Sequence, residues 1–456
     1  MIKKEMSHIL GRDIAYETLS STKKINAEIS RIREKLDEIS RSLGSEEKNR
    51  EDHERLFRIQ KFTEISQEFM SNEYVSLYCR EKTKKPRVLV CGFYGAKNIG
   101  DELMLEAILK LIPVDSLDVT ILLSNNYDLD ASEYAPFKVL HYPKRSSDIA
   151  AIAENFDAVI LGGGAILDDL EYVYRGQYST MSYILMSITK AILKKGGQVF
   201  VYGVSANDKL SDETFIKDLN YIIQHSDFFS LRDTNSLQVL KEAGVKIDKV
   251  KIIDDVSIYG LHNKVLKMKK SEDGSLCIGL NLILYEDRLA EYKRIIKSLV
   301  DYFEKPIKIV LIPFYDYGDS DKILLNRLIN EVGGKPVKCE LTKQPNNIED
   351  LLGIYEQCDY VFAMRYHAVL MAALMHRHAV MIDFQKNHRH YLNKNSYIKT
   401  TYMPDLLVLE YNDLCKNGIS KSTRIPETGI ASKKLNTIAE SIEKGIQNSL
   451  KKIRRL

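Results

Sequence analysis

The first 85 residues carry a different hydrophobic pattern from the rest of the chain. Apolar residues there recur at alternating steps of four and three, which is a heptad seam made of Ile25, Ile29, Ile32, Leu36, Ile39 and Leu43. A second amphipathic segment, residues 52–70, follows it. We therefore predict a helical extension over residues 1–85 with a short coiled coil. The seam, residues 25–43, suits a homo-oligomer and packing on its own chain equally well, and both remain open.

From Pro86 onward, short apolar runs alternate with amphipathic stretches. Strands are predicted at residues 87–95, 118–123, 138–140, 158–161, 198–206, 227–233, 249–255, 276–284, 307–314, 359–364 and 378–384. Helices are predicted between them at residues 101–112, 147–155, 181–193, 211–225, 234–244, 288–303, 319–332 and 348–357, and again after 365. Strands that alternate with helices in this way indicate parallel sheets covered on both faces.

A polar, basic segment without any period, residues 262–275, separates two such series and is predicted to be a linker. We expect one domain over residues 86–261, a second over 276–430, and a C-terminal amphipathic helix over 431–456. The predicted fold class is α/β, with two doubly wound, Rossmann-like domains after the helical extension. Ligands of such sheets bind at the carboxyl ends of the strands.

Composition and charge narrow the class of protein. The chain has 456 residues, of which 44% are hydrophobic, and its 66 basic and 63 acidic residues give a net charge of +3, so nucleic acid is not an expected partner. Its six cysteines form no CxxC pair and suggest reduced, buried thiols. The N-terminal residues lack the apolar core of a signal peptide, and no apolar run is long enough to span a membrane, which predicts a cytoplasmic protein.

A glycine-rich segment, residues 92–101, joins the first strand of the α/β region to its helix. Glycines such as Gly95 and Gly100 let the backbone turn tightly and approach a ligand, and Asn98 lies between them. The segment matches neither a Walker loop nor the GxGxxG dinucleotide motif. Asp101 is placed to cap the following helix or to act on a substrate, and the pattern leaves both open.

A second glycine run, Gly162-Gly163-Gly164, follows the strand at residues 158–161, with Asp168 and Asp169 shortly after it. At the carboxyl end of a strand such a run predicts a sharp turn or a backbone nest for a ligand. We regard Gly163, Gly164 and Asp169 as candidate substrate-binding residues.

Three basic or titratable side chains are predicted at the carboxyl ends of strands. Arg232 ends one strand, and Arg365 and His367 stand where another strand gives way to an apolar helix. A helix N-terminus favours anions, and an arginine binds a carboxylate or phosphate with two hydrogen bonds. The alternatives are a salt bridge from Arg232 to Asp233 or Asp254, and a solvated loop for the other two.

Histidines gather near this helix, with five of the ten between His367 and His390. No carboxylate or cysteine accompanies them at the spacing of metal ligands, so we predict no metal site.

Five segments in a fixed order resemble the polysaccharide pyruvyl transferase family. They are GFYGAKNIGDELML (92–105), LGGGAILDD (161–169), SLRDTNSLQVLKEAG (230–244), KIIDDVSIY (251–259) and MRYHAVLMAALMHRHAVMIDFQKN (364–387). The resemblance implies a GT-B-like pair of domains, the first on the acceptor side and the second on the donor side. It also implies that Arg232, Arg365 and His367 bind phosphoenolpyruvate and take part in catalysis.

The implied reaction transfers a pyruvyl group from phosphoenolpyruvate to two hydroxyls of one sugar in a surface polysaccharide or cell-wall precursor, giving a ketal and phosphate. His367 is the candidate acid, Asp101 or Asp169 the base, and Lys386 a further positive charge. Phosphoenolpyruvate is then a co-substrate and no cofactor is expected. The chain departs from the family at Tyr366, where leucine is common, and at Asp254-Asp255-Val256, where a proline is usual.

Two other functions are compatible with the same pattern. One is a GT-B glycosyltransferase that uses a nucleotide sugar, and the other is a non-catalytic polysaccharide-assembly protein. The acceptor expected from the resemblance is a glycan or a lipid-linked glycan. The basic C-terminal helix suits a peripheral contact with the inner face of the membrane, or packing against the domains.

Overall fold

The computed structural model describes residues 84–124, 134–143, 146–169, 181–206, 209–262, 275–283, 286–314, 326–330, 338–341, 348–384, 402–426 and 432–453, and residues 74, 76 and 77. The predicted coiled coil and the second amphipathic helix lie outside these residues. So do most of the predicted linker and most of the helix predicted at 319–332.

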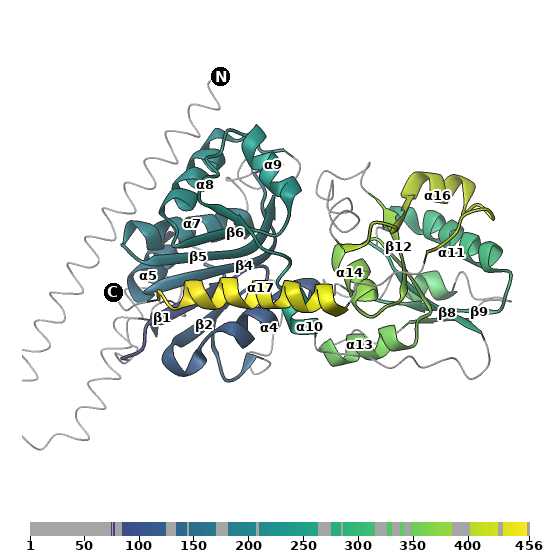
Figure 1. The fold of residues 1–456 in the computed structure, drawn as a ribbon, viewed down its shortest axis with the longest axis horizontal. Helices are drawn as coiled ribbons and strands as arrows, with labels where there is room; N and C mark the ends of the chain where they lie inside the picture. Colours follow the sequence, from purple (N-terminus) through teal and green to yellow (C-terminus); the bar gives the residue numbers. More distant parts are fainter. Residues whose placement is uncertain are drawn as a thin grey trace, which may run out of the picture.

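The first sheet has seven parallel strands in the order β3-β2-β1-β4-β5-β6-β7 (Figure 1). Their bounds are β1 Arg87–Cys91, β2 Asp118–Leu123, β3 Lys138–His141, β4 Ala158–Leu167, β5 Gln198–Ala206, β6 Phe228–Leu231 and β7 Val250–Ile252. Strand β1 pairs with β2 on one side and with β4 on the other, so that Val90 lies opposite Ile121 and Ile160. Strands β2 and β3 are thus added on one side of β1 and strands β4 to β7 on the other, so the strand order reverses between β1 and β4.

The second sheet repeats this arrangement with six parallel strands in the order β10-β9-β8-β11-β12-β13. Their bounds are β8 Leu276–Asn281, β9 Ile307–Leu311, β10 Lys338–Leu341, β11 Tyr360–Ala363, β12 His378–Asp383 and β13 Leu407–Glu410. Its reversal lies between β8 and β11. The prediction of two Rossmann-like domains in a GT-B-like pair is confirmed, and ligand sites are expected at these two reversal points.

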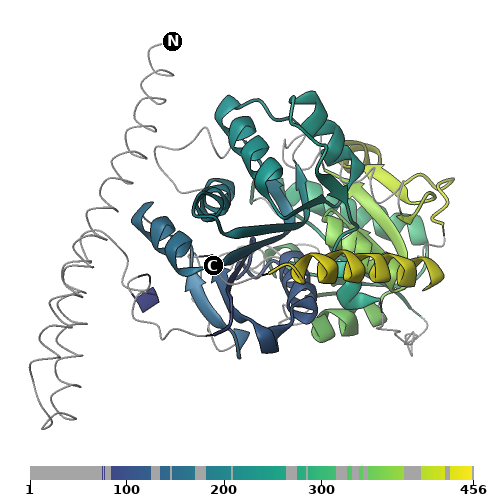
Figure 2. The same cartoon turned by 60° about the vertical axis from the view of Figure 1, so that its left-hand side comes forward.

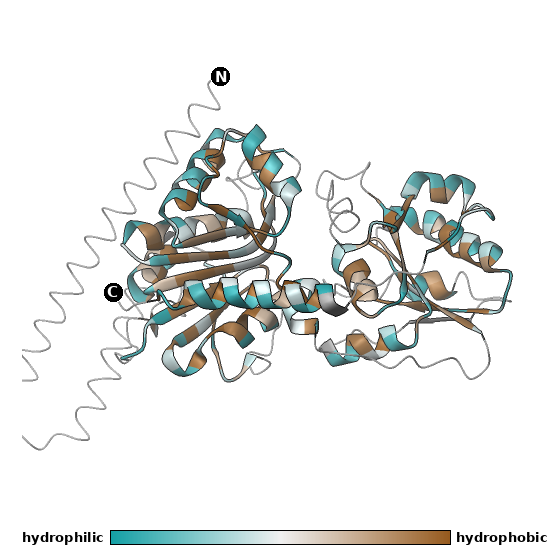
Figure 3. Ribbon diagram, in the orientation of Figure 1, coloured by the Kyte–Doolittle hydropathy of each residue, from teal (hydrophilic) through white to brown (hydrophobic). Residues whose placement is uncertain are grey.

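Helices cover both faces of each sheet. Their bounds are α4 Ile99–Leu111, η1 Val114–Ser116, α5 Ser146–Asn155, α7 Met181–Lys194, α8 Glu213–His225, α9 Thr234–Glu242, α10 Ser257–Leu261, η3 Glu286–Arg288, α11 Leu289–Phe303, α13 Ile348–Glu356, α14 Tyr366–Leu374, α16 Tyr411–Asn417 and α17 Ser432–Leu450. The strands are apolar along most of their length, as parallel strands buried on both faces must be (Figure 3). Helices α5, α7, α8 and α9 pack on one face of the first sheet, and α11 and α16 on one face of the second.

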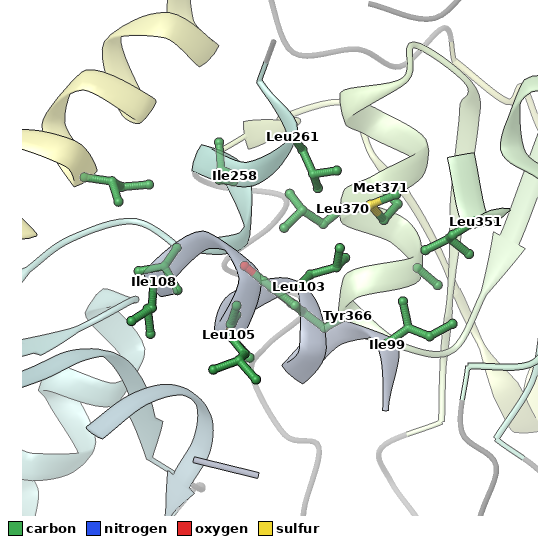
Figure 4. Packing of buried hydrophobic residues seen from close by; sticks show 14 of the residues in the cluster. Ile99, Leu103, Leu105, Ile108, Ile258, Leu261, Leu351, Tyr366, Leu370 and Met371 are labelled. Atoms are coloured by element: carbon green, nitrogen blue, oxygen red, sulfur yellow. The ribbon is translucent and has the colours of Figure 1, made fainter. Parts of the chain in front are cut away.

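The remaining faces of the two sheets meet in one continuous hydrophobic core. Helices α4, α10 and α17 on the first sheet contribute to it, and so do α13 and α14 on the second. Figure 4 shows Leu103 of α4 and Leu261 of α10 beside Leu370 and Met371 of α14. The junction between the domains is therefore an apolar interior, which holds the two sheet edges that carry the candidate site in fixed positions.

Helix α17 returns from the second domain and lies along the first, in both views of the molecule (Figures 1 and 2). Its buried stripe consists of Leu435, Ile438, Ala439, Ile442, Ile446 and Leu450. Near its end, Ser449 Oγ and Tyr202 Oη of β5 are 2.5 Å apart, and Gln198 Nε2 donates to Lys452 O at 2.9 Å. The predicted amphipathic C-terminal helix thus packs against the domains.

We expect Ile442→Ala to destabilise the protein by about 2–5 kcal/mol, because Ile442 is fully buried in the shared core and the smaller side chain leaves a cavity. Urea unfolding followed by circular dichroism measures the loss. Lys444→Ala, on the exposed face of the same helix, is the matched control and should change stability by less than about 0.5 kcal/mol. Equal losses from both variants would contradict the packing of α17.

The described cysteines behave as the composition predicts. Cys91, Cys277, Cys358 and Cys415 are buried and are not part of a disulfide. Burial raises the pKa of the Cys415 thiol to about 11, so this side chain is an unreactive part of the packing.

Candidate functional site

Arg232 follows β6 at the carboxyl edge of the first sheet and is 3% exposed. Its Nη1 donates to Asp255 Oδ2 at 2.9 Å, and its Nε lies 4.0 Å from Asp233 Oδ2. Burial lowers the pKa of the guanidinium, but the negative charge of Asp255 and its neighbours outweighs burial and holds that pKa above its ordinary value. Arg232 is therefore a buried cation with a fixed carboxylate partner.

The sequence points to Asp233 or Asp254 as the partner of Arg232, and for Asp254 this is wrong. Asp233 caps α9 by accepting a hydrogen bond from Ser236 N at 2.6 Å, and it makes only a distant contact with the arginine. Asp254 accepts a hydrogen bond from Tyr402 Oη of the second domain at 2.8 Å. The residue after it, Asp255, is the one that faces Arg232.

Asp255 is the residue of the site that the sequence reasoning missed. It is fully buried, and its Oδ1 accepts from Ser257 N at 3.0 Å and from Ser257 Oγ at 2.6 Å. Its Oδ2 lies 3.4 Å from His367 Nε2 as well as bonding to Arg232. Burial raises the pKa of the Asp255 carboxyl, but the positive charges of His367 and Arg232 together lower it well below its ordinary value. The carboxylate is thus ionised at neutral pH.

Arg365, Tyr366 and His367 begin α14, as the pattern predicts. Arg365 is the N-cap residue, with an extended backbone at φ −91° and ψ 138°, and its amide donates to Asn281 Oδ1 at 3.3 Å. The His367 ring stands edge-on to the ring of Tyr366, with centroids 5.0 Å apart. Both rings project from the second domain toward the first.

Tyr366 joins the two domains through Arg232, whose guanidinium carbon lies 4.6 Å from the centroid of the tyrosine ring. Such a cation–π contact is worth about 2 kcal/mol when it is desolvated. The aromatic face of Tyr366 therefore covers the buried arginine.

The two glycine-rich segments touch each other at the edge of the first sheet. Tyr94 Oη donates to Gly162 O at 2.7 Å, and a Cβ on Gly92 would lie 2.6 Å from the same oxygen. Gly95 N donates to Glu102 Oε1 at 2.7 Å, which ties the loop to the first turn of α4. The glycines of this loop therefore allow close packing against the second glycine-rich segment, and the predicted approach of a ligand stays a prediction.

Asn98, not Asp101, occupies the N-cap position of α4. The helix begins two residues earlier than predicted, because Asn98 O already accepts hydrogen bonds from the amides of Asp101 and Glu102. The capping role that the sequence left open for Asp101 is therefore wrong. Asp101 is buried in the first turn, and a Cβ on Gly164 would lie 2.9 Å from its Oδ1.

The predicted sharp turn at Gly162–Gly164 is also wrong. Strand β4 continues through all three glycines to Leu167, with a register shift against β5 between Gly164 and Leu167. Gly163 and Gly164 have φ of +66° and +86°, which other residues rarely adopt. A side chain at Gly163 would overlap Met104 of α4. The glycines therefore let the bulged strand pack closely against the first two turns of α4.

Gly100 makes room for His367. A Cβ on Gly100 would lie 2.1 Å from His367 Nδ1, so the imidazole occupies the space that a side chain would take. The preceding amide, Ile99 N, donates to Phe314 O of the second domain at 3.2 Å. The start of α4 and the start of α14 thus face each other across the domain junction.

Two further predicted site residues, Asp169 and Lys386, are not seen in the cluster of Arg232, Asp255 and His367. Asp169 Oδ2 accepts hydrogen bonds from the amides of Ser211 and Asp212, which fixes the approach to α8. Lys386 lies outside the described residues.

Asn281 is a second residue that sequence reasoning missed. It ends β8 in full burial, donates from Nδ2 to Ile312 O at 2.9 Å, and accepts the Arg365 amide on Oδ1. Its own carbonyl accepts from Met364 N at 3.0 Å. One side chain thereby holds the ends of β8, β9 and β11 together and sets where α14 begins.

Within the described ranges, no three His, Cys, Asp or Glu side chains are grouped so that they would hold a metal ion. No helix in those ranges combines the length and the apolar character needed to cross a membrane.

The topology and the cluster define a two-domain α/β protein in which Arg232 and Asp255 of the first domain meet His367 of the second at the carboxyl edges of the sheets. The chain belongs to the polysaccharide pyruvyl transferase family, whose family model matches residues 98–385. That range contains every candidate site residue except Gly95 and Lys386. No curated protein sequence matches the chain.

Several solved structures are similar to the chain at low sequence identity. A putative UDP-N-acetylglucosamine 2-epimerase from Listeria monocytogenes has a TM-score of 0.47 and 11% identity, covering 80% of this chain and 91% of that one. UDP-GlcNAc 2-epimerase from Neisseria meningitidis, bound to UDP-GlcNAc, has a TM-score of 0.46 and 11% identity, covering 80% and 97%. HepE from Anabaena, in complex with UDP-glucose, has a TM-score of 0.44 and 12% identity, covering 81% and 95%.

Proposed function

We propose that the protein transfers the pyruvyl group of phosphoenolpyruvate to two hydroxyls of one sugar in a polysaccharide or cell-wall precursor. The single observation that carries the proposal is the meeting of Arg232, Arg365 and His367, from different domains, around the start of α14. Membership of the family supports the same chemistry. The products are a cyclic pyruvate ketal and inorganic phosphate.

The donor carries a carboxylate and a phosphate, and the cluster offers matching groups. Arg365 stands at the N-terminus of α14, where the helix dipole and free amides favour an anion. Arg232 provides a second guanidinium at the facing sheet edge. In the proposal these two arginines bind the donor, and Lys386 adds a third positive charge.

The chemistry needs an acid and a base in succession. His367 gives a proton to the methylene carbon of phosphoenolpyruvate, which leaves a cationic C2 for the first sugar hydroxyl to attack. The hydroxyl proton passes to a carboxylate. The C2–O bond to the phosphate then breaks, the phosphate leaves with the electron pair and takes up the proton of the second hydroxyl, and that hydroxyl oxygen bonds to C2 and closes the ketal. One proton ends on the new methyl group and the other on the released phosphate.

Asp101 is the better of the two candidate bases. It lies next to Gly100, which packs on His367, whereas Asp169 Oδ2 already accepts two backbone amides. No metal or redox cofactor is needed for these steps, and phosphoenolpyruvate is the co-substrate. The acceptor in the proposal is a glycan or a lipid-linked glycan.

We expect phosphoenolpyruvate to stabilise the protein and UDP-sugars to leave it unchanged. A ligand at 100 times its dissociation constant adds about 2.7 kcal/mol, which a thermal shift assay detects readily. Arg365→Gln should lose the shift, and Arg424→Gln, at an exposed arginine elsewhere in the second domain, should keep it. A shift seen only with UDP-glucose or UDP-GlcNAc would favour a nucleotide-sugar glycosyltransferase, and no shift with either would favour a non-catalytic assembly protein.

A further inference from the structure

Asp255 is held more firmly than a side chain that merely neutralises an arginine. It is fully buried, and one of its oxygens is fixed by both the amide and the hydroxyl of Ser257, the first residue of α10. Its orientation is therefore set by the first domain alone. A side chain that contacts the second oxygen of Asp255 is therefore positioned by the first domain.

The second oxygen, Oδ2, contacts both domains. It accepts from Arg232 Nη1 at 2.9 Å and lies 3.4 Å from His367 Nε2. The 3.4 Å contact has the separation of an ion pair without the geometry of a short hydrogen bond. The Asp255 carboxylate therefore contacts both Arg232, which is proposed to bind the donor, and His367, which is proposed to be the acid.

The contact also distinguishes the two nitrogens of His367. Nε2 faces Asp255, and Nδ1 is turned toward Gly100 at the start of α4. A carboxylate beside one ring nitrogen keeps the proton on that nitrogen and leaves the other for proton transfer. The same division of roles makes an aspartate essential to a catalytic triad, where its amide variant favours the wrong tautomer.

We propose that Asp255 is a positioning residue, which holds a proton on Nε2 of His367, assigns proton transfer to Nδ1, and fixes the histidine relative to Arg232. The part that Nδ1 plays in turnover rests on the proposed pyruvyl transfer. The orientation of the His367 ring by Asp255 is independent of that proposal.

The charged and titratable groups around this contact come from three elements, β6, α14 and α4. Arg232 and Asp233 face it from the end of β6, and Tyr366 covers Arg232 from α14. Arg365 precedes Tyr366 at the N-cap, and Asp101 lies in the first turn of α4 beside Gly100. Asp255 has the shortest approach to His367 that the structure gives among these groups.

A different role for Asp255 would be to occupy the place of the donor carboxylate, since it bonds to the arginine proposed to bind the donor. Removing its charge would then tighten the binding of phosphoenolpyruvate. The fixed Oδ1 argues against such a displaceable contact, because Ser257 holds it with two hydrogen bonds. The two roles predict opposite changes in kinetics.

The kinetic test compares Asp255→Asn with Asp254→Asn, the adjacent carboxylate that bonds to Tyr402 instead. We expect Asp255→Asn to lower kcat by about 10²-fold or more with KM for phosphoenolpyruvate within about threefold, measured as phosphate release from phosphoenolpyruvate in the presence of a lipid-linked glycan acceptor. Asp254→Asn should keep kcat within about threefold. A lower KM with kcat retained would overturn the proposal in favour of the displaceable contact, and unchanged kinetics would overturn it as well.

Ser257→Ala keeps the charge of Asp255 and removes one of the bonds that orient it. A reduced kcat with unchanged KM supports the positioning role, and an unchanged kcat overturns it. This variant decides the question if Asp255→Asn does not fold.

A measurement without substrate separates this inference from the proposed function. Long-range 1H–15N spectra report which imidazole nitrogen carries a proton, and His367→Gln identifies the His367 signals by their loss. We expect the proton on Nε2 in the native protein and in Asp254→Asn, and a changed tautomer in Asp255→Asn. The same pattern in all three proteins would overturn the inference even if pyruvyl transfer is found. If no transfer is found, the changed tautomer still establishes the positioning contact.

Discussion

His367→Ala is expected to lower phosphate release from phosphoenolpyruvate by at least about 10²-fold, because a positioned acid contributes about 10²–10⁴-fold to a proton transfer. The proton that reaches the methylene carbon has no other donor in the proposal. The fold should persist, since Asp255 keeps its bond to Arg232 when the histidine is removed. The measurement is phosphate release with a suitable glycan acceptor at saturating donor.

The control for this variant is His225→Ala, at an exposed histidine near the end of α8 whose Nδ1 contacts Tyr221 O. It should retain the native rate, and circular dichroism should be the same for both variants. Donor binding in a thermal shift assay should survive in His367→Ala, because Arg232 and Arg365 remain. Unchanged turnover in His367→Ala would remove His367 from the mechanism.

Arg232→Met is expected to destabilise the protein by about 3–5 kcal/mol, because it leaves the fully buried Asp255 without its guanidinium partner. The cation–π contact with Tyr366 is lost at the same time. Urea unfolding measures the loss. Arg288→Met is the matched control: this half-buried arginine lies over Phe384 and near Glu291, and its loss should cost about 1 kcal/mol or less.

The effect of Arg232→Met should also depend on pH with a definite sign. Arg232 helps to lower the folded-state pKa of Asp255, so the pair contributes stability above the ordinary carboxyl pKa of about 4 and loses it as the pH falls below that value. The difference between native and variant proteins should therefore be constant from pH 7 to 5 and shrink below about pH 4.

A double variant tests whether the loss comes from the pair. Arg232→Met with Asp255→Asn removes both charges, and it should recover much of the stability that Arg232→Met loses. Additive losses from the two substitutions would show that the two side chains do not interact in solution.

The fold was predictable because its signals are local. Apolar runs such as residues 118–123 and 307–311 identify buried strands, and parallel strands bring their carboxyl ends to one edge. The hydrophobic pattern alone therefore places Arg232, Arg365 and His367 correctly at the ends of strands and at the start of a helix.

The errors come from interactions that no local pattern encodes. Which of two adjacent aspartates faces Arg232 depends on the five-residue helix α10, whose first residue, Ser257, turns Asp255 inward. The glycines of β4 resemble a turn in sequence, because positive φ is needed for both a turn and a bulged strand. In the sequence Asn281 is only one residue of a predicted strand. Its contact with the Arg365 amide depends on the folded chain, which brings the two residues together. The apolar stripe of α17 shows that it packs, but not that it packs on the first domain.

The apolar core shared by α4, α10 and α17 with α13 and α14 bears on how such proteins diversify. Where domains meet through a small polar surface, one of them can be exchanged for a relative's without loss of folding. Here an exchanged domain would have to match side chains such as Leu103, Leu261 and Leu370 across the junction, as well as the contact of Asp255 with His367. New acceptor specificity is therefore expected to arise through substitutions at the sheet edges, with the two halves inherited together.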